Sequence, residues 1–121
     1  MKPDITVGDV VVDCGDAKKL QNFYAELLGW EKCELYGIPA LKGPLVLLFA
    51  QEPDYVAPVW PEEDGRQQKQ LHFDFVVADV PAAVARAEAL GAARTKAQFG
   101  GAHFTTMTDP AGHPFCLCAK G

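Results

Sequence analysis

An internal repeat is the feature that most constrains how this chain can fold. The segment DVVVDCGDAKKLQNFYAELLGW, residues 9–30, has the same design as HFDFVVADVPAAVARAEALGA, residues 72–92. Each contains a β-rich run, a short turn with Asp, and a helical pattern that ends in Leu-Gly. The two segments begin 63 residues apart, and the same offset separates Asp16 from Asp79. The sequence therefore predicts two modules of equivalent structure.

Each copy contains the signals of one helix. Apolar residues of the first copy follow the 3, 4, 7, 8 spacing of one helical face: Leu20, Phe23, Tyr24, Leu27 and Leu28. Asp16 is placed to cap this helix and Gly29 to end it. In the second copy Asp79 and Gly91 have the same roles, and Pro81 falls in the first turn, where a missing N–H is harmless. We predict one capped helix in each module.

Short β-like runs follow each predicted helix. They are CELYGIPALKG and PLVLLFAQ in the first half, and RTKAQF, AHFTTMT and HPFCLCA in the second. FGGA at residues 99–102 predicts a hairpin turn, and DPAG at residues 109–112 predicts a type I turn. Both halves therefore follow the order βαβββ, and we expect an α+β fold.

We expect a single domain over residues 1–121, divided into two modules. Module 1 spans about 4–52 and module 2 about 71–119, with a connecting loop at about 53–70. The stretch from residue 51 to residue 70 is rich in Pro, which predicts an extended surface connection. A lid or interface and a solvated linker pinned by its aromatic residues are equally compatible with its composition.

Composition and charge exclude several classes of protein. With 49% hydrophobic and 22% charged residues, the 121-residue chain has the composition of a folded domain. Its net charge of −5 lacks the basic character that binding to nucleic acid needs, and no apolar run is long enough to span a membrane. The start lacks the layout of a secretory signal, so we expect a cytoplasmic protein with reduced cysteines.

The pattern as a whole resembles a known superfamily. Two βαβββ halves, FY…LLGW in the first helix, AVARAEALGA in the second and DPAGHPFCL before the last strand are similar to the vicinal oxygen chelate superfamily. That superfamily includes glyoxalase I, bleomycin-resistance proteins and extradiol dioxygenases, and the likeness is closest to its small glyoxalase-like domain proteins. It covers residues from about Ile5 to Ala119. The resemblance implies curved mixed sheets around a shared cavity, and a homodimer.

The resemblance also implies where a divalent metal ion would bind. In metal-dependent members four side chains hold the ion, one from the first strand and one from the last strand of each half. These positions fall on Asp9, His72 and Cys116, and on residues 46–48, where no side chain offers a ligand atom. We therefore expect no intact four-ligand site and no cofactor. If an ion binds, the resemblance implies Asp9, His72 and Cys116 as ligands, and this mixed set favours Zn²⁺ over Mg²⁺.

Alternative ligands and roles remain for several residues. A shifted strand register would let Gln51 or Glu52 supply the fourth ligand. His72 and Asp74 alternate along a strand and so face the same side. If that side is the cavity, His72 is a candidate proton shuttle or hydrogen-bond donor, with Asp9 as its acid/base partner. Otherwise His72 is a hydrogen-bonded histidine that lines the pocket.

Other residues are candidates for contact with a ligand. Aromatic and sulfur-containing side chains are typical of apolar pocket walls, and the same side chains also suit an ordinary core. Alternation places Cys116 and Cys118 on one face of the last strand. The predicted ligand-binding residues are Tyr55, Trp60, Asp74, Phe104, Met107 and Cys116.

We expect a glyoxalase-like protein that binds a small organic molecule in an apolar cavity. One alternative is a metal-dependent lyase, isomerase or dioxygenase-like enzyme that uses Asp9, His72 and Cys116 around a divalent ion. The other is an accessory interaction module with a vestigial cavity, in which Trp60 and its loop would serve an interface.

Overall fold

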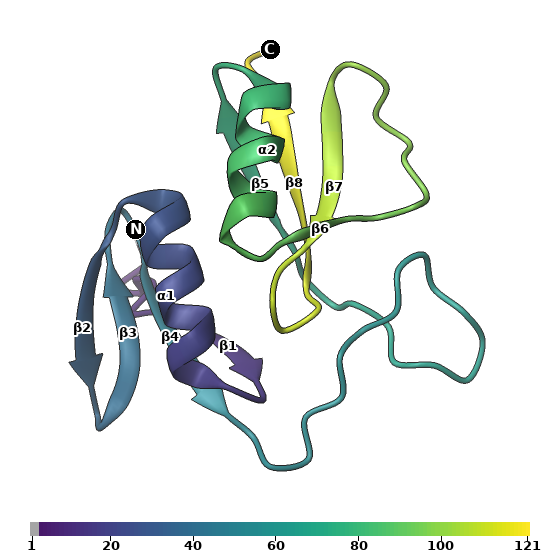
Figure 1. The fold of residues 1–121 in the computed structure, drawn as a ribbon. Coiled ribbons are helices and arrows are strands. Elements are labelled where there is room, and N and C mark those ends of the chain that lie inside the picture. Colours follow the sequence, from purple (N-terminus) through teal and green to yellow (C-terminus); the bar gives the residue numbers. More distant parts are fainter. Residues whose placement is uncertain (1–2) are drawn as a thin grey trace. The chain divides into compact units, whose positions relative to one another are not determined.

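Each half of the chain folds in the predicted βαβββ order. The computed structural model describes residues 3–121. The chain divides into a first unit that ends at Tyr55 and a second unit that runs from Val56 to Gly121 (Figure 1). The elements of the first unit are β1 (Val10–Cys14), α1 (Ala17–Leu28), β2 (Glu31–Leu35), β3 (Ile38–Lys42) and β4 (Val46–Gln51). Those of the second are β5 (Phe73–Val77), α2 (Val80–Leu90), β6 (Ala93–Arg94), β7 (Phe104–Thr108) and β8 (Pro114–Ala119).

The two sheets have the same topology. The strand orders are β1-β4-β3-β2 and β5-β8-β7-β6. In each sheet the first strand of the unit pairs in parallel with the last, and the remaining pairs are antiparallel. The mixed sheets confirm the α+β prediction and make the two units equivalent strand by strand.

The predicted helix ends are confirmed in both units. The Asp16 carboxylate accepts a hydrogen bond from the Lys19 N–H at 3.1 Å, and the Asp79 carboxylate accepts one from Ala82 at 3.0 Å. These bonds satisfy backbone donors that the first turn of a helix leaves without partners. Gly29 closes α1 in the left-handed conformation at φ 69°, which suits a residue without a Cβ.

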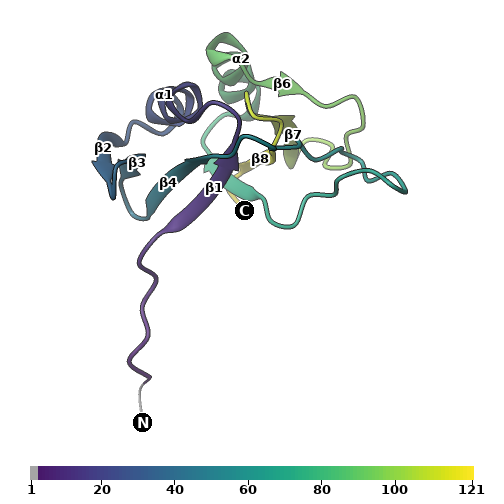
Figure 2. The same cartoon turned by 90° about the horizontal axis from the view of Figure 1, so that it is seen from below.

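Helix α1 packs on one face of the first sheet (Figure 2). Its Tyr24 ring stacks on Phe49 of β4, with ring centroids 6.1 Å apart. The Gln21 side-chain amide donates to the carbonyls of Cys33 and Ala40, so it joins the helix to β2 and β3. The core of the first unit therefore lies between α1 and the sheet.

The core of the second unit follows the same plan. Buried residues of α2 and of the central strands form it: Val84, Ala87, Met107, Phe115 and Leu117. Successive strand residues face opposite sides of a sheet, so Thr106, Cys116 and Cys118 face away from this core. That second face carries the candidate site.

One predicted strand is much shorter than expected. RTKAQF was expected to be β-like, but β6 ends at Arg94 and residues 95–103 form a loop. The reason is a side chain that replaces the backbone ladder. The Gln98 side chain donates to the carbonyl of Thr106 and accepts from its N–H. These backbone groups of β7 are therefore hydrogen-bonded although the loop is not a strand.

The turns and the connecting loop also differ in detail from expectation. The DPAG turn is confirmed, because the Gly112 N–H donates to the Asp109 carbonyl at 2.8 Å. FGGA contains part of a turn, in which the His103 N–H donates to the Gly100 carbonyl, but this turn lies at the end of the 95–103 loop. The connecting loop is not extended throughout, because Val59 and Gln67 are hydrogen-bonded across it. No helix within residues 3–121 is long and apolar enough to cross a membrane.

Candidate functional site

A pocket of about 300 Å³ lies against the second sheet, on the face that carries Thr106 and Cys116. All its lining residues belong to the second unit. They are Trp60, Lys69, His72, Asp74, Phe99, Phe104, Thr106, Pro114, Cys116 and Cys118.

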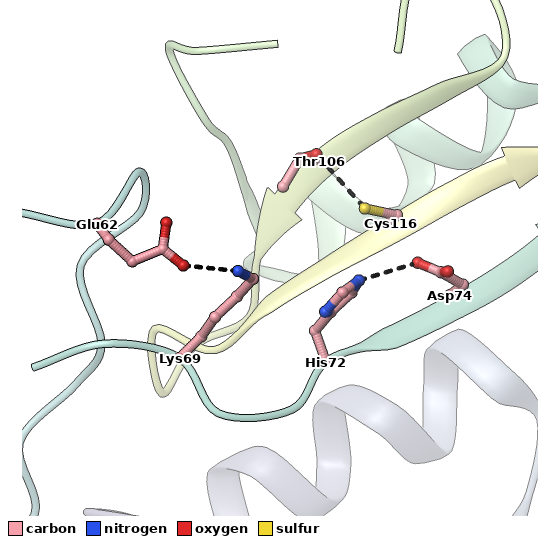
Figure 3. Close-up of polar contacts among 6 residues, drawn as sticks. All are labelled: Glu62, Lys69, His72, Asp74, Thr106 and Cys116. Carbon is pink, nitrogen blue, oxygen red and sulfur yellow. Dashed lines mark hydrogen bonds and ion pairs between the residues drawn. The ribbon is translucent and has the colours of Figure 1, made fainter. Parts of the chain in front are cut away.

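The strand register brings the polar lining residues together. Asp74 of β5 is paired with Cys116 of β8, and Cys116 is paired with Thr106 of β7. The hairpin turn at residues 109–112 sets the second pairing. His72 directly precedes β5 and lies on the same side as Asp74 (Figure 3). Three adjacent strands therefore present their polar side chains at one place.

Hydrogen bonds and ion pairs organise this polar cluster (Figure 3). His72 Nε2 lies 3.3 Å from an Asp74 carboxylate oxygen. Cys116 Sγ lies 3.4 Å from the Thr106 hydroxyl, in a buried contact. His72, Asp74 and Cys116 each offer one atom able to bind a metal ion, and these three atoms lie within 4.8 Å of one another. The cluster thus combines an imidazole, a carboxylate and a thiol.

The cysteines of the pocket are held in the neutral thiol form. Burial raises the pKa of the Cys116 thiol above its ordinary value; the Thr106 hydrogen bond opposes this change, and the negative charge of Asp74 adds to it. Burial, with smaller contributions from Asp74 and Cys116, also raises the pKa of Cys118. A raised pKa disfavours the thiolate that nucleophilic catalysis needs. Neither residue has the character of an activated nucleophile.

The pocket lining also contains aromatic rings. Trp60 meets Phe99 edge to face, with ring centroids 6.1 Å apart. The Lys69 ammonium lies 4.0 Å from the Trp60 ring centroid, a cation–π contact, and 2.7 Å from the Glu62 carboxylate. The hydrogen bond from Lys69 lowers the pKa of Glu62. These contacts hold the indole in place as a wall.

The structure places five of the predicted residues around this pocket: His72, Trp60, Asp74, Phe104 and Cys116. Met107 is fully buried and pairs with Phe115, so it lies in the core of the second unit. Tyr55 ends the first unit and is outside the pocket lining. Asp9 directly precedes β1 of the first unit, and its partnership with His72 stays a prediction.

Sequence reasoning missed Lys69, Phe99, Thr106 and Pro114 as lining residues. A signal for Thr106 was present, because counting outward from the DPAG turn pairs it with Cys116. Lys69 and Phe99 lie in irregular loops, where no periodicity indicates a direction.

The register also tests the four-ligand metal site implied by the resemblance. In the repeat, Val11 corresponds to Asp74, since the two are 63 residues apart. Val11 pairs with Leu48 across β1 and β4, and Asp74 pairs with Cys116 across β5 and β8. Leu48 is therefore the counterpart of Cys116, and its side chain has no atom that binds a metal. The four-ligand arrangement does not fit this chain.

Comparison with known proteins shows the family. The family model described as "Glyoxalase-like domain" matches residues 9–118. No curated protein matches the sequence significantly.

Solved structures with low sequence identity share the fold. The fosfomycin resistance protein FosX from Listeria monocytogenes is similar with a TM-score of 0.70 and 16% identity, over 100% of this chain and 96% of that one. An antibiotic-binding protein from a Streptomyces species has a TM-score of 0.64 and 19% identity, over 99% and 100% of the two chains. Lactoylglutathione lyase from Agrobacterium tumefaciens has a TM-score of 0.60 and 22% identity, over 98% and 96%. With the family match over most of its length, the chain belongs to the glyoxalase-like domain family of the vicinal oxygen chelate superfamily.

Proposed function

We propose that the protein binds a small amphipathic organic molecule, with an aromatic or other planar apolar part, in the pocket of the second unit. The observation that carries the proposal is that the lining of this pocket combines aromatic rings with a few polar side chains. Ligand sites in proteins are typically apolar hollows with a few polar groups that fix the orientation of the ligand.

The aromatic rings of the lining support binding of a flat apolar group. Trp60, Phe99 and Phe104 all contribute rings to the lining. Phe99 keeps 68% of its surface exposed, so much of its ring is free to contact a ligand. A volume of about 300 Å³ is at the lower end of the range for ligand pockets, which favours a small molecule.

The polar side chains of the lining support orientation of the ligand. His72 is partly exposed at the pocket and offers a nitrogen to a ligand oxygen or N–H. Lys69 offers a positive charge, and the Thr106 hydroxyl offers a donor and an acceptor. These groups favour a ligand that carries at least one polar oxygen.

One similar fold is consistent with a binding role, because that protein is called an antibiotic-binding protein. Binding needs only walls and polar anchors, whereas the four-ligand metal arrangement does not fit this chain. Binding is therefore favoured over metal-dependent lyase chemistry of the superfamily type.

The experiment is a titration with anilinonaphthalene sulfonate, an amphipathic aromatic anion, followed by its fluorescence. We expect saturable binding of one molecule per chain, weakened about tenfold or more by Phe104→Ala, a loss of roughly 1.4 kcal/mol or more. Tyr36→Ala is the matched control, because Tyr36 is an exposed aromatic residue in the first unit. Binding that is absent, or equally affected by both variants, would contradict the proposal.

Pairing into a homodimer is a second part of the proposal. Val11 and Val76 support it, because they are 53% and 65% exposed on strands of the two sheets, and exposed apolar surface favours association. Light scattering is expected to give twice the mass of the chain. The mass of a single chain would contradict this part and leave the binding proposal standing.

A further inference from the structure

We propose that His72, Asp74 and Cys116 form a zinc site contained within the second unit. The proposal goes beyond ligand binding, and it is tested on the protein without any organic molecule. It also differs from the arrangement that the superfamily resemblance implies, since that arrangement draws ligands from both halves.

The donor set is the first support. Imidazole nitrogen, carboxylate oxygen and thiolate sulfur are all common ligands of Zn²⁺, and thiolate disfavours Mg²⁺ and Ca²⁺. Three protein ligands with a further open position form the usual arrangement of a zinc site that binds water or another small ligand. The exposed side chains of His72 and Asp74 leave solvent access for such a position.

The distances are the second support. With zinc–ligand bonds of about 2.0–2.3 Å in a tetrahedron, neighbouring donor atoms lie roughly 3.3–3.6 Å apart. His72 Nε2 and the Asp74 oxygen are already 3.3 Å apart. The largest separation within the cluster is at most 4.8 Å, so about 1 Å of side-chain movement closes it.

The backbone holds two of the ligands in fixed register. Asp74 and Cys116 are cross-strand partners in the parallel pair β5·β8, in which β5 is an edge strand and β8 an interior strand of the sheet. The Thr106 hydroxyl contacts Cys116 Sγ at 3.4 Å from the third strand. Such an outer hydrogen bond orients a metal ligand and stabilises its ionised form. The strand pairing thus fixes the relative backbone positions of Asp74 and Cys116, and His72 directly precedes β5.

The charges near the cluster are compatible with a divalent cation. Binding displaces the thiol proton of Cys116 to solvent, so a thiolate and a carboxylate then balance the 2+ charge of the ion. Lys69 is the positive residue in the pocket lining, and its ammonium is paired with Glu62 at 2.7 Å. That pairing reduces the repulsion between Lys69 and a bound cation.

The equivalent positions of the first unit contain no such set. The counterparts of Asp74 and Cys116 are Val11 and Leu48, neither of which has a ligand atom. Asp9 is the counterpart of His72, and of the three positions it alone has a side-chain atom that can bind a metal. The inference therefore predicts one zinc ion per chain.

The test uses Zn²⁺ and Co²⁺ on the full reduced chain. We expect one equivalent of Zn²⁺ by calorimetry, an increase in melting temperature that EDTA reverses, and a thiolate-to-cobalt charge-transfer band. His72→Ala, Asp74→Asn and Cys116→Ser should each weaken binding at least roughly 100-fold, more than loss of an outer partner costs. Cys116→Ser should also remove the cobalt band.

Two matched variants make the test specific. Cys118→Ser removes the thiol two residues from Cys116. Asp9→Ala removes the acidic ligand that the superfamily resemblance implies. Both variants should keep the full affinity for Zn²⁺ and the cobalt band. The melting curve of each metal-free variant tests whether that variant is folded. Asp74→Asn should not disturb folding, because the Asp74 side chain is 63% exposed. No binding, binding unaffected by Asp74→Asn, or binding lost in Asp9→Ala would each overturn the proposal.

Discussion

The side-chain amide of Gln98 forms two hydrogen bonds with the backbone of Thr106. Its nitrogen donates to the Thr106 carbonyl at 2.8 Å, and its oxygen accepts from the Thr106 N–H at 2.9 Å. The backbone N–H and the hydroxyl of Thr95 also donate hydrogen bonds to the Thr106 carbonyl. Two loop residues, Thr95 and Gln98, thus satisfy the backbone groups of Thr106 as a longer β6 would have done, and the Thr106 side chain faces the pocket.

Replacing Gln98 with Ala removes both of these hydrogen bonds. We expect the free energy of unfolding to fall by about 1–2 kcal/mol, since each bond contributes roughly 1 kcal/mol net. Chemical denaturation measures the change. Gln70→Ala is the control, because Gln70 is also an exposed glutamine of the second unit, and it should change stability by less than about 0.5 kcal/mol. Equal effects of the two variants would show that the Gln98 bonds contribute nothing.

Tyr36 is in an unfavourable backbone conformation for its residue type. The β2–β3 hairpin has a two-residue turn in which Tyr36 and Gly37 have φ values of 55° and 73°. Asn accepts this conformation much more readily than Tyr. Tyr36→Asn should therefore raise the free energy of unfolding by about 0.5–1 kcal/mol. The ring is 85% exposed, so its removal loses little packing, and a lower melting temperature would refute this explanation.

Gly100 is packed against the backbone and ring of Phe104. A Cβ at this position would lie 2.4 Å from the Phe104 carbonyl oxygen and 2.6 Å from its ring. Gly100→Ala should lower the free energy of unfolding by about 1–3 kcal/mol and weaken binding of the fluorescent probe, because the pocket wall must move. Gly8→Ala is the control, since no atom lies within 4 Å of the added carbon. An unchanged melting curve and an unchanged probe affinity would show that Phe104 moves aside without loss of stability or binding.

The buried Cys116 thiol makes stability depend on alkaline pH. Its pKa is raised in the folded chain, so the unfolded chain ionises first as pH rises. The stabilisation is complete below the ordinary thiol pKa and is lost as pH rises toward the folded value. Denaturation at about pH 8 and about pH 10 should show a smaller loss for Cys116→Ala than for the unchanged chain. Equal losses would mean that Cys116 ionises equally easily in both states.

Much of the fold was predictable because its signals are local. The repeat, the Asp caps and the Gly ends of both helices lie within short segments, and all were confirmed. The length of β6 was not predictable, because it depends on a contact between Gln98 and Thr106 rather than on the pattern of RTKAQF itself. Side-chain hydrogen bonds to the next strand overrode the local preference of that segment.

The candidate site was predictable only in part. Alternation along one strand put His72 and Asp74 on the same side, and the resemblance drew attention to Cys116. Their grouping depends on the pairing of β5 with β8, which joins residues far apart in the sequence. The resemblance pointed to Asp9 as the acidic metal ligand, so Asp74 was considered as a neighbour of His72 and a contact for an organic ligand, and not as a metal ligand.

The short β6 also affects how the second sheet meets other chains. A sheet edge with free backbone groups is a template for unwanted strand addition. The N–H and carbonyl of Thr106 on β7 already bond to Thr95 and Gln98, so an incoming strand finds no free partner at this residue. The corresponding edge of the first sheet is β2, a full five-residue strand that carries Glu31, Lys32 and Glu34. The two halves of this duplicated chain thus protect corresponding sheet edges differently: backbone groups are occupied at Thr106 in the second half, and charged side chains line β2 in the first.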